Sequence, residues 1–340
     1  MSEPRKKPRV LSGIQPTGHL HLGNYLGATR RWAAGQDKAD SYFCVVDLHA
    51  ITVFQDPEDL RQAVRSTAAL LLACGIDPDR SVLFVQSHVR AHAEASWLLS
   101  CVTPLGWLER MTQYKTKAGK QESVQTGLLT YPILQAGDIL LYDANEVPVG
   151  EDQKQHVELT RDIAQRFNHL YGETFVIPEP KIAKFGARIM GFDDPTAKMS
   201  KSAKARGHAV LLTDDDKEIT HTLRRAVTDS GREIHFSDDP EKAGVNNLLT
   251  VYQLLTEKDR DAVEADFADA RGYGDLKARV AEVVVEAVRP IRERYHELIT
   301  EPAELDRLLA RGAEAARELA EAKVVQMKEN MGFSVPDALR

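Results

Sequence analysis

A stretch near the amino terminus constrains the fold of this chain more than any other. Val10–Ile14 is apolar and predicts a buried strand, Gln15–Gly18 is a turn rich in proline and glycine, and Leu22–Trp32 has the periodicity of a helix. A strand that runs through a glycine turn into a helix directs unpaired backbone N–H groups and the positive end of the helix dipole at one place. The stretch therefore predicts a phosphate-binding turn; the alternative is an ordinary helix cap.

Two further features bear on that choice. His21 and Asn24 flank Gly23 on the first turn of the helix, where a glycine would let a flat base or ribose approach the backbone. Far downstream, Lys198–Ser202 reads Lys-Met-Ser-Lys-Ser and places two lysines and two hydroxyls on a loop. By itself such a loop is usually a solvated basic surface.

A buried helix with a polar face is predicted over Gly127–Tyr142. The segment is apolar nearly all round, yet Tyr131, Gln135 and Asp138 recur at i, i+4 and i+7 and so share one face. A buried carboxylate without a partner costs several kcal/mol, so this face should line a cavity that contains a hydrogen-bond donor. The alternative is a hydrogen-bond network satisfied within the protein.

The rest of the chain alternates strands and helices and then becomes helical. Further strands are predicted over Ser41–Val46, Ser81–Gln86 and Val147–Val149, with helices after Asp56, over Ala91–Cys101 and Leu105–Tyr114, and after Gly150. This pattern predicts an α/β fold with a doubly wound, Rossmann-type parallel sheet, whose carboxyl edge binds ligands. His49 follows the second strand at that edge, although a lone histidine is more often structural. Beyond Arg206 we expect a helical domain, with helices over Asp214–Ala226, Asn247–Thr256, Leu276–Leu298 and Ala303–Met331 and a polar loop at 231–244.

Charge and cysteine content narrow the class of protein. A net charge of −7 argues against a basic nucleic-acid binder overall, but local clusters such as Lys217–Arg225 still allow contact with RNA. Cys44, Cys74 and Cys101 are widely spaced, lack a Cys-x-x-Cys metal pattern, and are expected to be buried thiols in a reducing cytoplasm. We expect neither a signal peptide nor a membrane span.

The two signatures together, His-Leu-Gly-Asn and Lys-Met-Ser-Lys-Ser, resemble the pair that marks class I aminoacyl-tRNA synthetases. Four further stretches narrow the resemblance to bacterial tryptophanyl-tRNA synthetases: Ser12–Gly18, Asp47–Thr52, Val149–His156 and Gly186–Met190. It covers essentially the whole chain after a short basic tail. The implied activity is ATP-dependent activation of L-tryptophan to tryptophanyl-adenylate and its transfer to the terminal ribose of tRNA(Trp).

The resemblance also implies a domain organisation. Residues 1–8 would be the basic tail, 9–205 a Rossmann catalytic domain with a helical insertion between its halves, and 206–340 a helical domain that binds the tRNA anticodon. The last helices of that domain would pack back on the catalytic domain. The family implies a cytoplasmic homodimer that uses ATP with Mg²⁺ and has no metal site of its own.

Functional residues carry over by matching motifs. Catalysis would depend on His21, Asn24, Lys117, Lys198 and Lys201. ATP would be held by Gln15, Pro16, Thr17, Gly23, Asn24, Gly150, Glu151, Asp152, Ile189, Lys198, Met199, Ser200, Lys201 and Ser202. Tryptophan would be held by Leu11, His49, Tyr131, Gln135, Asp138, Val147, Val149 and Gln153, with Tyr131 and Gln153 on the amino group and Asp138 on the indole N–H. The chain departs from common patterns at Asn24, in place of a second histidine, and at Gln135, where many relatives carry Met.

Three alternatives remain at this level. One alternative is a tyrosyl-tRNA synthetase, since such enzymes also carry Tyr, Gln and Asp at this helical spacing. Against it, the enzymes of that type have a Tyr at the position where this chain has Leu11. A small-metabolite adenylyltransferase would leave the helical region after Arg206 without a purpose. A non-catalytic RNA-binding paralogue is disfavoured by the presence of both Lys198 and Lys201.

Overall fold

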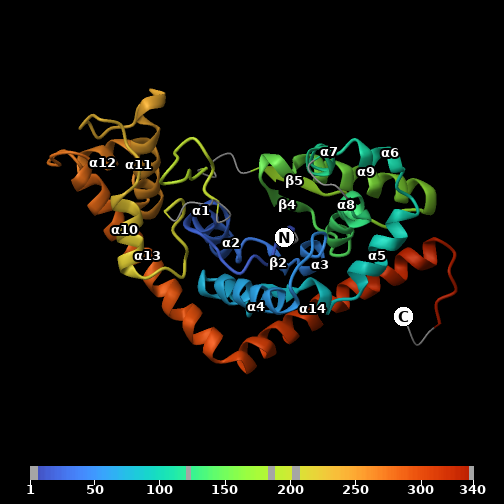
Figure 1. Cartoon of the computed structure of the whole chain (residues 1–340). Helices are drawn as coiled ribbons and strands as arrows, with labels where there is room; N and C mark the ends of the chain where they lie inside the picture. Colours follow the sequence, from blue (N-terminus) through green and yellow to red (C-terminus); the bar gives the residue numbers. More distant parts are fainter. Residues whose placement is uncertain (1–6, 120–123, 183–187, 201–206, 337–340) are drawn as a thin grey trace, which may run out of the picture.

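The centre of the molecule is a parallel five-stranded sheet with the order β3-β2-β1-β4-β5 (Figure 1). The computed structural model describes residues 7–119, 124–182, 188–200 and 207–336. The strands are β1 (Arg9–Ile14), β2 (Asp40–Val45), β3 (Val82–Val85), β4 (Glu146–Val149) and β5 (Glu179–Ile182). The strand order reverses at β1, so the crevice at its carboxyl end is the expected ligand site of a doubly wound sheet. The predicted fold class is confirmed.

Helices cover both faces of the sheet, as buried parallel strands require. In β2, Phe43 and Val45 point into one hydrophobic cluster, whereas Tyr42 and Cys44 point into the other. The helices of the sheet region are α1 (Leu22–Asn24), α2 (Arg30–Gly35), α3 (Asp47–Ala50), α4 (Pro57–Ala73), α5 (Ala91–Ser100), α6 (Leu105–Glu109), α7 (Thr112–Ala118), α8 (Thr126–Leu140) and α9 (Lys154–Tyr171). The first cluster contains residues of α4, and the second contains those of α5, α8 and α9.

Some predicted elements differ in detail. The single helix expected from Leu22 is instead α1, a π-helical turn over Tyr25–Thr29, and α2. The helix expected over Leu105–Tyr114 breaks after α6, where the Met111 side chain turns into the core. Strand β5 was not predicted because Glu179–Ile182 is short and has Pro180 within it, which hides the strand signal.

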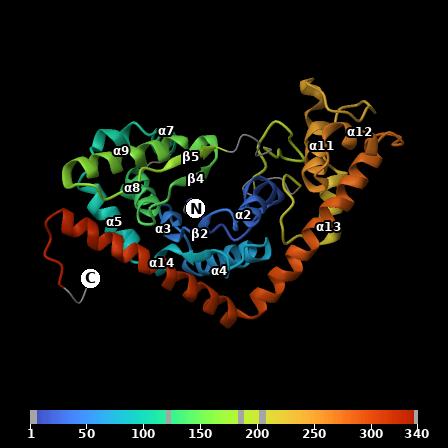
Figure 2. The same ribbon diagram turned by 180° about the vertical axis from the view of Figure 1, so that it is seen from behind.

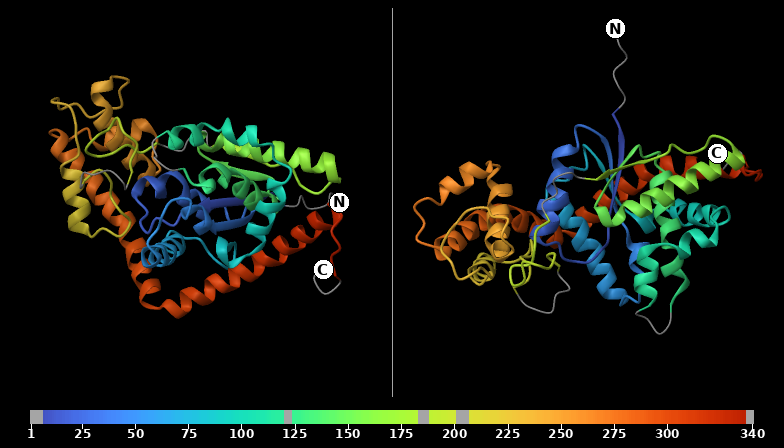
Figure 3. Two further views of the ribbon diagram at one scale, coloured as in Figure 1. Left: turned by 45° about the vertical axis from the view of Figure 1, so that its right-hand side comes forward. Right: turned by 90° about the horizontal axis from the view of Figure 1, so that it is seen from above.

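The described part of the chain after Gly207 consists of helices and the loops between them, apart from an isolated β-bridge between His21 and Leu211. Its helices are α10 (Asp216–Arg224), α11 (Ala243–Thr256), α12 (Arg260–Asp266), α13 (Tyr273–Thr300) and α14 (Pro302–Asn330). Four of them were predicted, and the short α12 was not. Helix α13 packs on α10, α11 and α4, and it meets α14 at an elbow below α4 (Figures 2 and 3).

The cysteines differ from expectation at one position. Cys44 and Cys74 are buried, but Cys101 is exposed because it caps the carboxyl end of α5 at the surface. Of the helices in the described ranges, none is long and apolar enough to cross a membrane.

Helix α14 covers the edge strand β3, which would otherwise offer an unpaired row of backbone groups. The approach is close because Gly312 faces the strand. A Cβ at Gly312 would lie 1.8 Å from the carbonyl oxygen of Leu83 and 2.7 Å from its carbonyl carbon. Only glycine therefore fits at this point of the helix–strand contact.

We predict that Gly312→Ala lowers the free energy of unfolding by about 2 kcal/mol, because the helix must move away from β3 to admit the methyl group. Denaturant unfolding measures the change. Gly274→Ala is the matched control, since nothing lies within 4 Å of a Cβ at this position on α13. Equal stability of Gly312→Ala and wild type would show that the two elements separate without cost.

Candidate active site

His21 and Asn24 close the first turn of α1. The Nδ1 atom of His21 accepts from the Asn24 N–H at 3.2 Å, and the Asn24 Oδ1 accepts from the His21 N–H at 3.1 Å. The two side chains thus form a reciprocal capping box. The cap that we considered as an alternative is present, and it fixes the conformation around Gly23.

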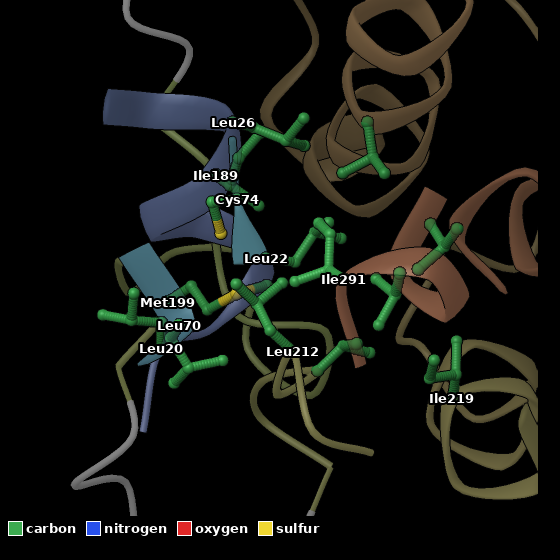
Figure 4. Close-up of a cluster of buried hydrophobic side chains, with 14 of the residues drawn as sticks. Leu20, Leu22, Leu26, Leu70, Cys74, Ile189, Met199, Leu212, Ile219 and Ile291 are labelled. Carbon is green, nitrogen blue, oxygen red and sulfur yellow. The ribbon is translucent and has the colours of Figure 1, made fainter. Parts of the chain in front are cut away.

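Gly23 brings the two sequence signatures together. A Cβ at this position would lie 3.1 Å from His21 Nδ1 and 3.4 Å from Met199 Sδ. Met199 belongs to the Lys-Met-Ser-Lys-Ser stretch, and its side chain packs in the same buried cluster as Leu20 and Leu22 (Figure 4). The start of the distant loop therefore lies directly beside the turn at the carboxyl end of β1.

Lys198 lies at the end of a short antiparallel hairpin. The backbones of Met190 and Lys198 form an antiparallel β-bridge, and the Met199 N–H donates to the Ile189 carbonyl at 3.0 Å. The Lys198 side chain is exposed, whereas those of Ile189 and Met199 are buried in the core. A contact of Ile189 or Met199 with ATP would have to use main-chain atoms, and it stays a prediction.

The buried Asp138 carboxylate is the most highly coordinated polar group of the site. Its Oδ1 accepts from Gln86 Nε2 at 2.6 Å and pairs with His92 Nδ1 at 2.7 Å, and its Oδ2 pairs with His49 Nε2 at 2.7 Å. The side chain of His92 is itself fully buried. The premise that Asp138 needs a donor from a ligand is therefore wrong, since an internal network supplies donors. A carboxylate has about four acceptor positions, so one remains on Oδ2.

These contacts fix the charge of Asp138. Burial alone would raise its pKa, but the charge and hydrogen bond of His49, together with the hydrogen bond of His92, outweigh burial and hold the pKa well below the usual range for an aspartate. The group is therefore ionised at neutral pH. The site contains a fixed negative charge at the carboxyl edge of β2 and β3.

Tyr131 lies seven residues, or about two helical turns, before Asp138 on α8 and so shares a face of the helix with it. Its hydroxyl lies 2.8 Å from His156 Nε2 and donates to Gln113 Oε1 at 3.3 Å, and its ring meets the His49 ring edge-on. Burial raises the pKa of Tyr131 to about 12, so the phenol is neutral. Tyr131, His49 and Asp138 are thus brought together as predicted for one binding surface.

The other residues predicted for the tryptophan site differ in burial. Leu11 and Val147 are buried in the second cluster, and Gln135 and Val149 are half-buried. Gln153 ends a 3₁₀ turn that follows β4, where its Nε2 donates to Asp152 Oδ2 at 3.0 Å.

The Gly150–Gln153 turn connects a strand to a helix, as the opening stretch does. It lies at the carboxyl end of β4 and leads directly into α9. A Cβ on Gly150 would lie 2.7 Å from Asp152 Oδ1, so glycine leaves room for that carboxylate. Glu151 and Asp152 are exposed. Their contact with the hydroxyl groups of a ribose stays a prediction.

A cavity of about 780 Å³ opens beside the opening turn. Gln15, Pro16, Thr17 and His49 line it, together with residues of α4 and of the α13–α14 elbow. Lys198 and Asp138 are not among the lining residues. His49 therefore lies between the cavity and the Asp138 network.

Two predicted lysines fall outside what the structure describes. Lys201 and Ser202 lie outside the described residues, as does the side chain of Lys117 in α7. Sequence reasoning in turn missed Gln86, His92 and His156. Gln86 follows β3 at the same sheet edge that pointed to His49, so one rule could have found it. No sequence signal marks His92.

The fold and the site define a nucleotide-binding α/β enzyme of the class I aminoacyl-tRNA synthetase type, with two signatures meeting at the carboxyl edge of β1. Residues 3–289 match the family described as tRNA synthetases class I (W and Y). The Tryptophan--tRNA ligase of Wolinella succinogenes is 51% identical over 96% of this chain and 99% of its own length.

Solved structures agree with this match. The tryptophanyl-tRNA synthetase of Mycoplasma pneumoniae is 35% identical with a TM-score of 0.86, covering 96% of this chain and 98% of that one. The Campylobacter jejuni tryptophanyl-tRNA synthetase complexed with ADP and tryptophan is 37% identical with a TM-score of 0.84, covering 96% and 100%. The chain belongs to the tryptophan–tRNA ligase family.

We predict that Asp138→Asn lowers the free energy of unfolding at neutral pH by about 3 kcal/mol, since the buried partners of the carboxylate lose their charged acceptor. A lowered folded-state pKa stabilises above the unfolded-state pKa of about 4, and this stabilisation is lost as pH falls through the folded-state value. The difference between wild type and variant should therefore shrink on acidification from about pH 6 to about pH 3. Urea unfolding at several pH values measures it.

Asp162→Asn, at an exposed position on α9, is the control. It should show no comparable change with pH. A difference between wild type and Asp138→Asn that stays constant across the pH range would contradict the assignment of a depressed pKa to Asp138.

Proposed function

We propose that this chain activates L-tryptophan with ATP to form tryptophanyl-adenylate and pyrophosphate, and then transfers the aminoacyl group to the terminal ribose of tRNA(Trp). The contact of Gly23 with Met199 carries the proposal, because it unites the two signature stretches at one sheet edge. Relatives that match nearly the whole chain carry this activity in their names, and one of them is complexed with ADP and tryptophan.

The first step requires positioning rather than a protein nucleophile. The carboxylate of tryptophan is ionised at pH 7 and attacks the α-phosphorus of ATP, while the bond to pyrophosphate breaks. Negative charge builds on the leaving phosphates, so cations placed beforehand lower the barrier. We infer that the exposed Lys198 side chain, on the hairpin whose Met199 lies beside Gly23, supplies one such cation.

Mg²⁺ would share this load when bound by neutralising phosphate oxygens. The described residues contain no group of three or more His, Cys, Asp or Glu side chains that could hold a metal ion. We therefore propose that Mg²⁺ arrives with the nucleotide and is held mainly by its phosphates and by water, as this ion prefers.

The binding surface around Asp138 would select the amino acid. Oδ2 pairs with His49, whose ring meets that of Tyr131 edge-on, and we infer that the acceptor position left on Oδ2 takes the indole N–H. Phenylalanine has no ring donor and would leave that position unfilled, which can cost on the order of 10⁴-fold in specificity. Tyrosine also has a donor, so its rejection would rest on the apolar wall at Leu11.

The decisive test of the function is amino-acid-dependent exchange of pyrophosphate with ATP, run separately with each of the twenty amino acids. Tryptophan should support exchange far better than any other. A preference for tyrosine would assign the chain to the tyrosine branch, and no exchange with any amino acid would indicate a non-catalytic RNA-binding protein.

We predict that Lys198→Ala slows adenylate formation about 10²-fold and leaves tryptophan affinity nearly unchanged, since its contact strengthens only as charge develops on pyrophosphate. Stopped-flow kinetics and equilibrium dialysis measure the two quantities. Lys38→Ala, an exposed lysine far from the hairpin in sequence, should change neither. Weakened tryptophan binding at an unchanged rate would remove Lys198 from this role.

A second prediction concerns the proposed RNA-binding role of the helical region. Lys217, Arg224 and Arg225 are exposed on or next to α10. Changing all three to Glu should leave exchange activity intact and strongly reduce aminoacylation, because only the second step needs tRNA. Filter binding and aminoacylation assays test this, and equal loss of both activities in a folded variant would contradict it.

We further propose that the protein is a cytoplasmic homodimer. Ile51, Val53 and Phe54 are 58%, 47% and 92% exposed, so the segment after α3 presents apolar side chains next to the site. Such a patch is typical of an interface. Sedimentation equilibrium of Phe54→Glu against wild type tests the assignment, and an unchanged mass would place the interface elsewhere.

A further inference from the structure

His208 is a buried histidine that contacts the backbone of the Lys198 hairpin. Its Nε2 lies 3.2 Å from the Lys198 carbonyl oxygen, and its Nδ1 lies 2.5 Å from Asp193 Oδ1. Its ring is 7% exposed. We propose that His208, oriented by Asp193, is a positioning residue that sets the location of Lys198 for adenylate formation.

The hairpin is built to receive this ring. A Cβ on Gly191 would lie 2.2 Å from His208 Cε1 and 2.5 Å from Nδ1, so only glycine leaves space for the imidazole. The Phe192 N–H donates to the His208 carbonyl at 3.0 Å, which ties the backbone of the histidine to the same hairpin. The side chain of His208 therefore contacts Lys198 on the second strand of the hairpin, and its main chain is hydrogen-bonded to Phe192 on the first.

The geometry gives each ring nitrogen a separate task. Asp193 is an acceptor at Nδ1 and fixes the rotation of the ring, so that Nε2 points at the Lys198 carbonyl. A neutral imidazole carries one N–H, whereas the protonated ring can donate to both acceptors. With the Nδ1 proton donated to Asp193, a hydrogen bond from Nε2 to the Lys198 carbonyl requires the protonated ring, and this bond limits movement of the Lys198 backbone.

A second anchor acts on the other strand of the hairpin. The buried Asn247 side chain on α11 accepts from the Met190 N–H at 2.9 Å and donates to the Met190 carbonyl at 3.0 Å. Met190 pairs with Lys198 across the hairpin. Asn247 thus holds the base of the hairpin, and His208 holds the residue that carries the cation.

A backbone contact of this kind matters because the lysine side chain is flexible. The ammonium sits on a four-carbon stem with many rotamers, so its reach is defined only by where the Cα is held. A displacement of about 1 Å in a catalytic group can cost up to 10²-fold in rate. This inference rests on the proposed role of Lys198 in the activation step.

The test is a double-mutant cycle of His208→Ala and Lys198→Ala, with the rate of adenylate formation as the measured quantity. We expect His208→Ala alone to slow the step about tenfold without changing tryptophan affinity, and to have almost no further effect once Lys198 is Ala. Asp193→Ala should behave like His208→Ala, and His208→Gln should recover part of the rate, since its amide N–H can reach the Lys198 carbonyl. His169→Ala, at an exposed position on α9, is the control.

The outcomes separate the two proposals. If Lys198→Ala does not slow the step, the proposed role of Lys198 is wrong and this inference falls with it. If Lys198→Ala slows the step but the effects of the two substitutions add, His208 acts elsewhere and only this inference is overturned. Thermal unfolding of each variant shows that it is folded, and a large rate loss that appears only with unfolding would also overturn the positioning role.

Discussion

The active site depends on a short hydrogen-bonded junction between the opening turn and the chain that follows the Lys198 loop. The Leu22 N–H donates to the Val210 carbonyl at 2.8 Å, and the Leu212 N–H donates to the Leu20 carbonyl at 2.8 Å. Around this junction the side chains of Leu20, Leu22 and Leu212 belong to one hydrophobic cluster (Figure 4). The same cluster contains Met199 and Ile189 of the hairpin, Ile219 of α10 and Ile291 of α13. The helical region and the nucleotide turn therefore share a core. Anything that moves α10 or α13 also acts on the turn that we assign to ATP.

The Asp138 network places a different demand on the fold. Transfer of a carboxylate from water into the protein is unfavourable unless charge and hydrogen bonds replace hydration. Here His49 comes from α3, Gln86 follows β3, and His92 comes from α5, so three separate elements converge on one residue of α8. Their arrangement requires the sheet edge and both helices to be packed correctly. The carboxylate that we propose binds tryptophan is consequently hydrogen-bonded in place by the protein itself.

Much of this structure is readable from the sequence, because local rules act there. The strand, turn and helix from Val10 follow from apolar periodicity and the glycine turn, and the buried helix α8 follows from its continuous apolar surface. The meeting of Gly23 with Met199 is different, since residues so distant in the chain are joined only by tertiary packing. The resemblance of the two signatures to a known family was what indicated that these two stretches belong to one site. The partners of Asp138 could not be derived either, because periodicity places a residue on a face but does not say what that face meets.

The two halves of the site are held in physically different ways. On the side that we propose binds the amino acid, Asp138 is held by a charged network inside the core, so a wrong ligand would not be accommodated by moving the carboxylate. On the side that we propose binds the phosphates, Lys198 is exposed and is held through its backbone at the end of a hairpin. A rigid polar surface suits discrimination between rings of similar size, because unpaired buried groups are expensive. A tethered cation suits a polyphosphate whose charge moves during the reaction, since the ammonium can follow the charge while its Cα stays in place. The division of rigidity between core and hairpin thus matches the division that we propose between choosing the amino acid and stabilising the leaving pyrophosphate.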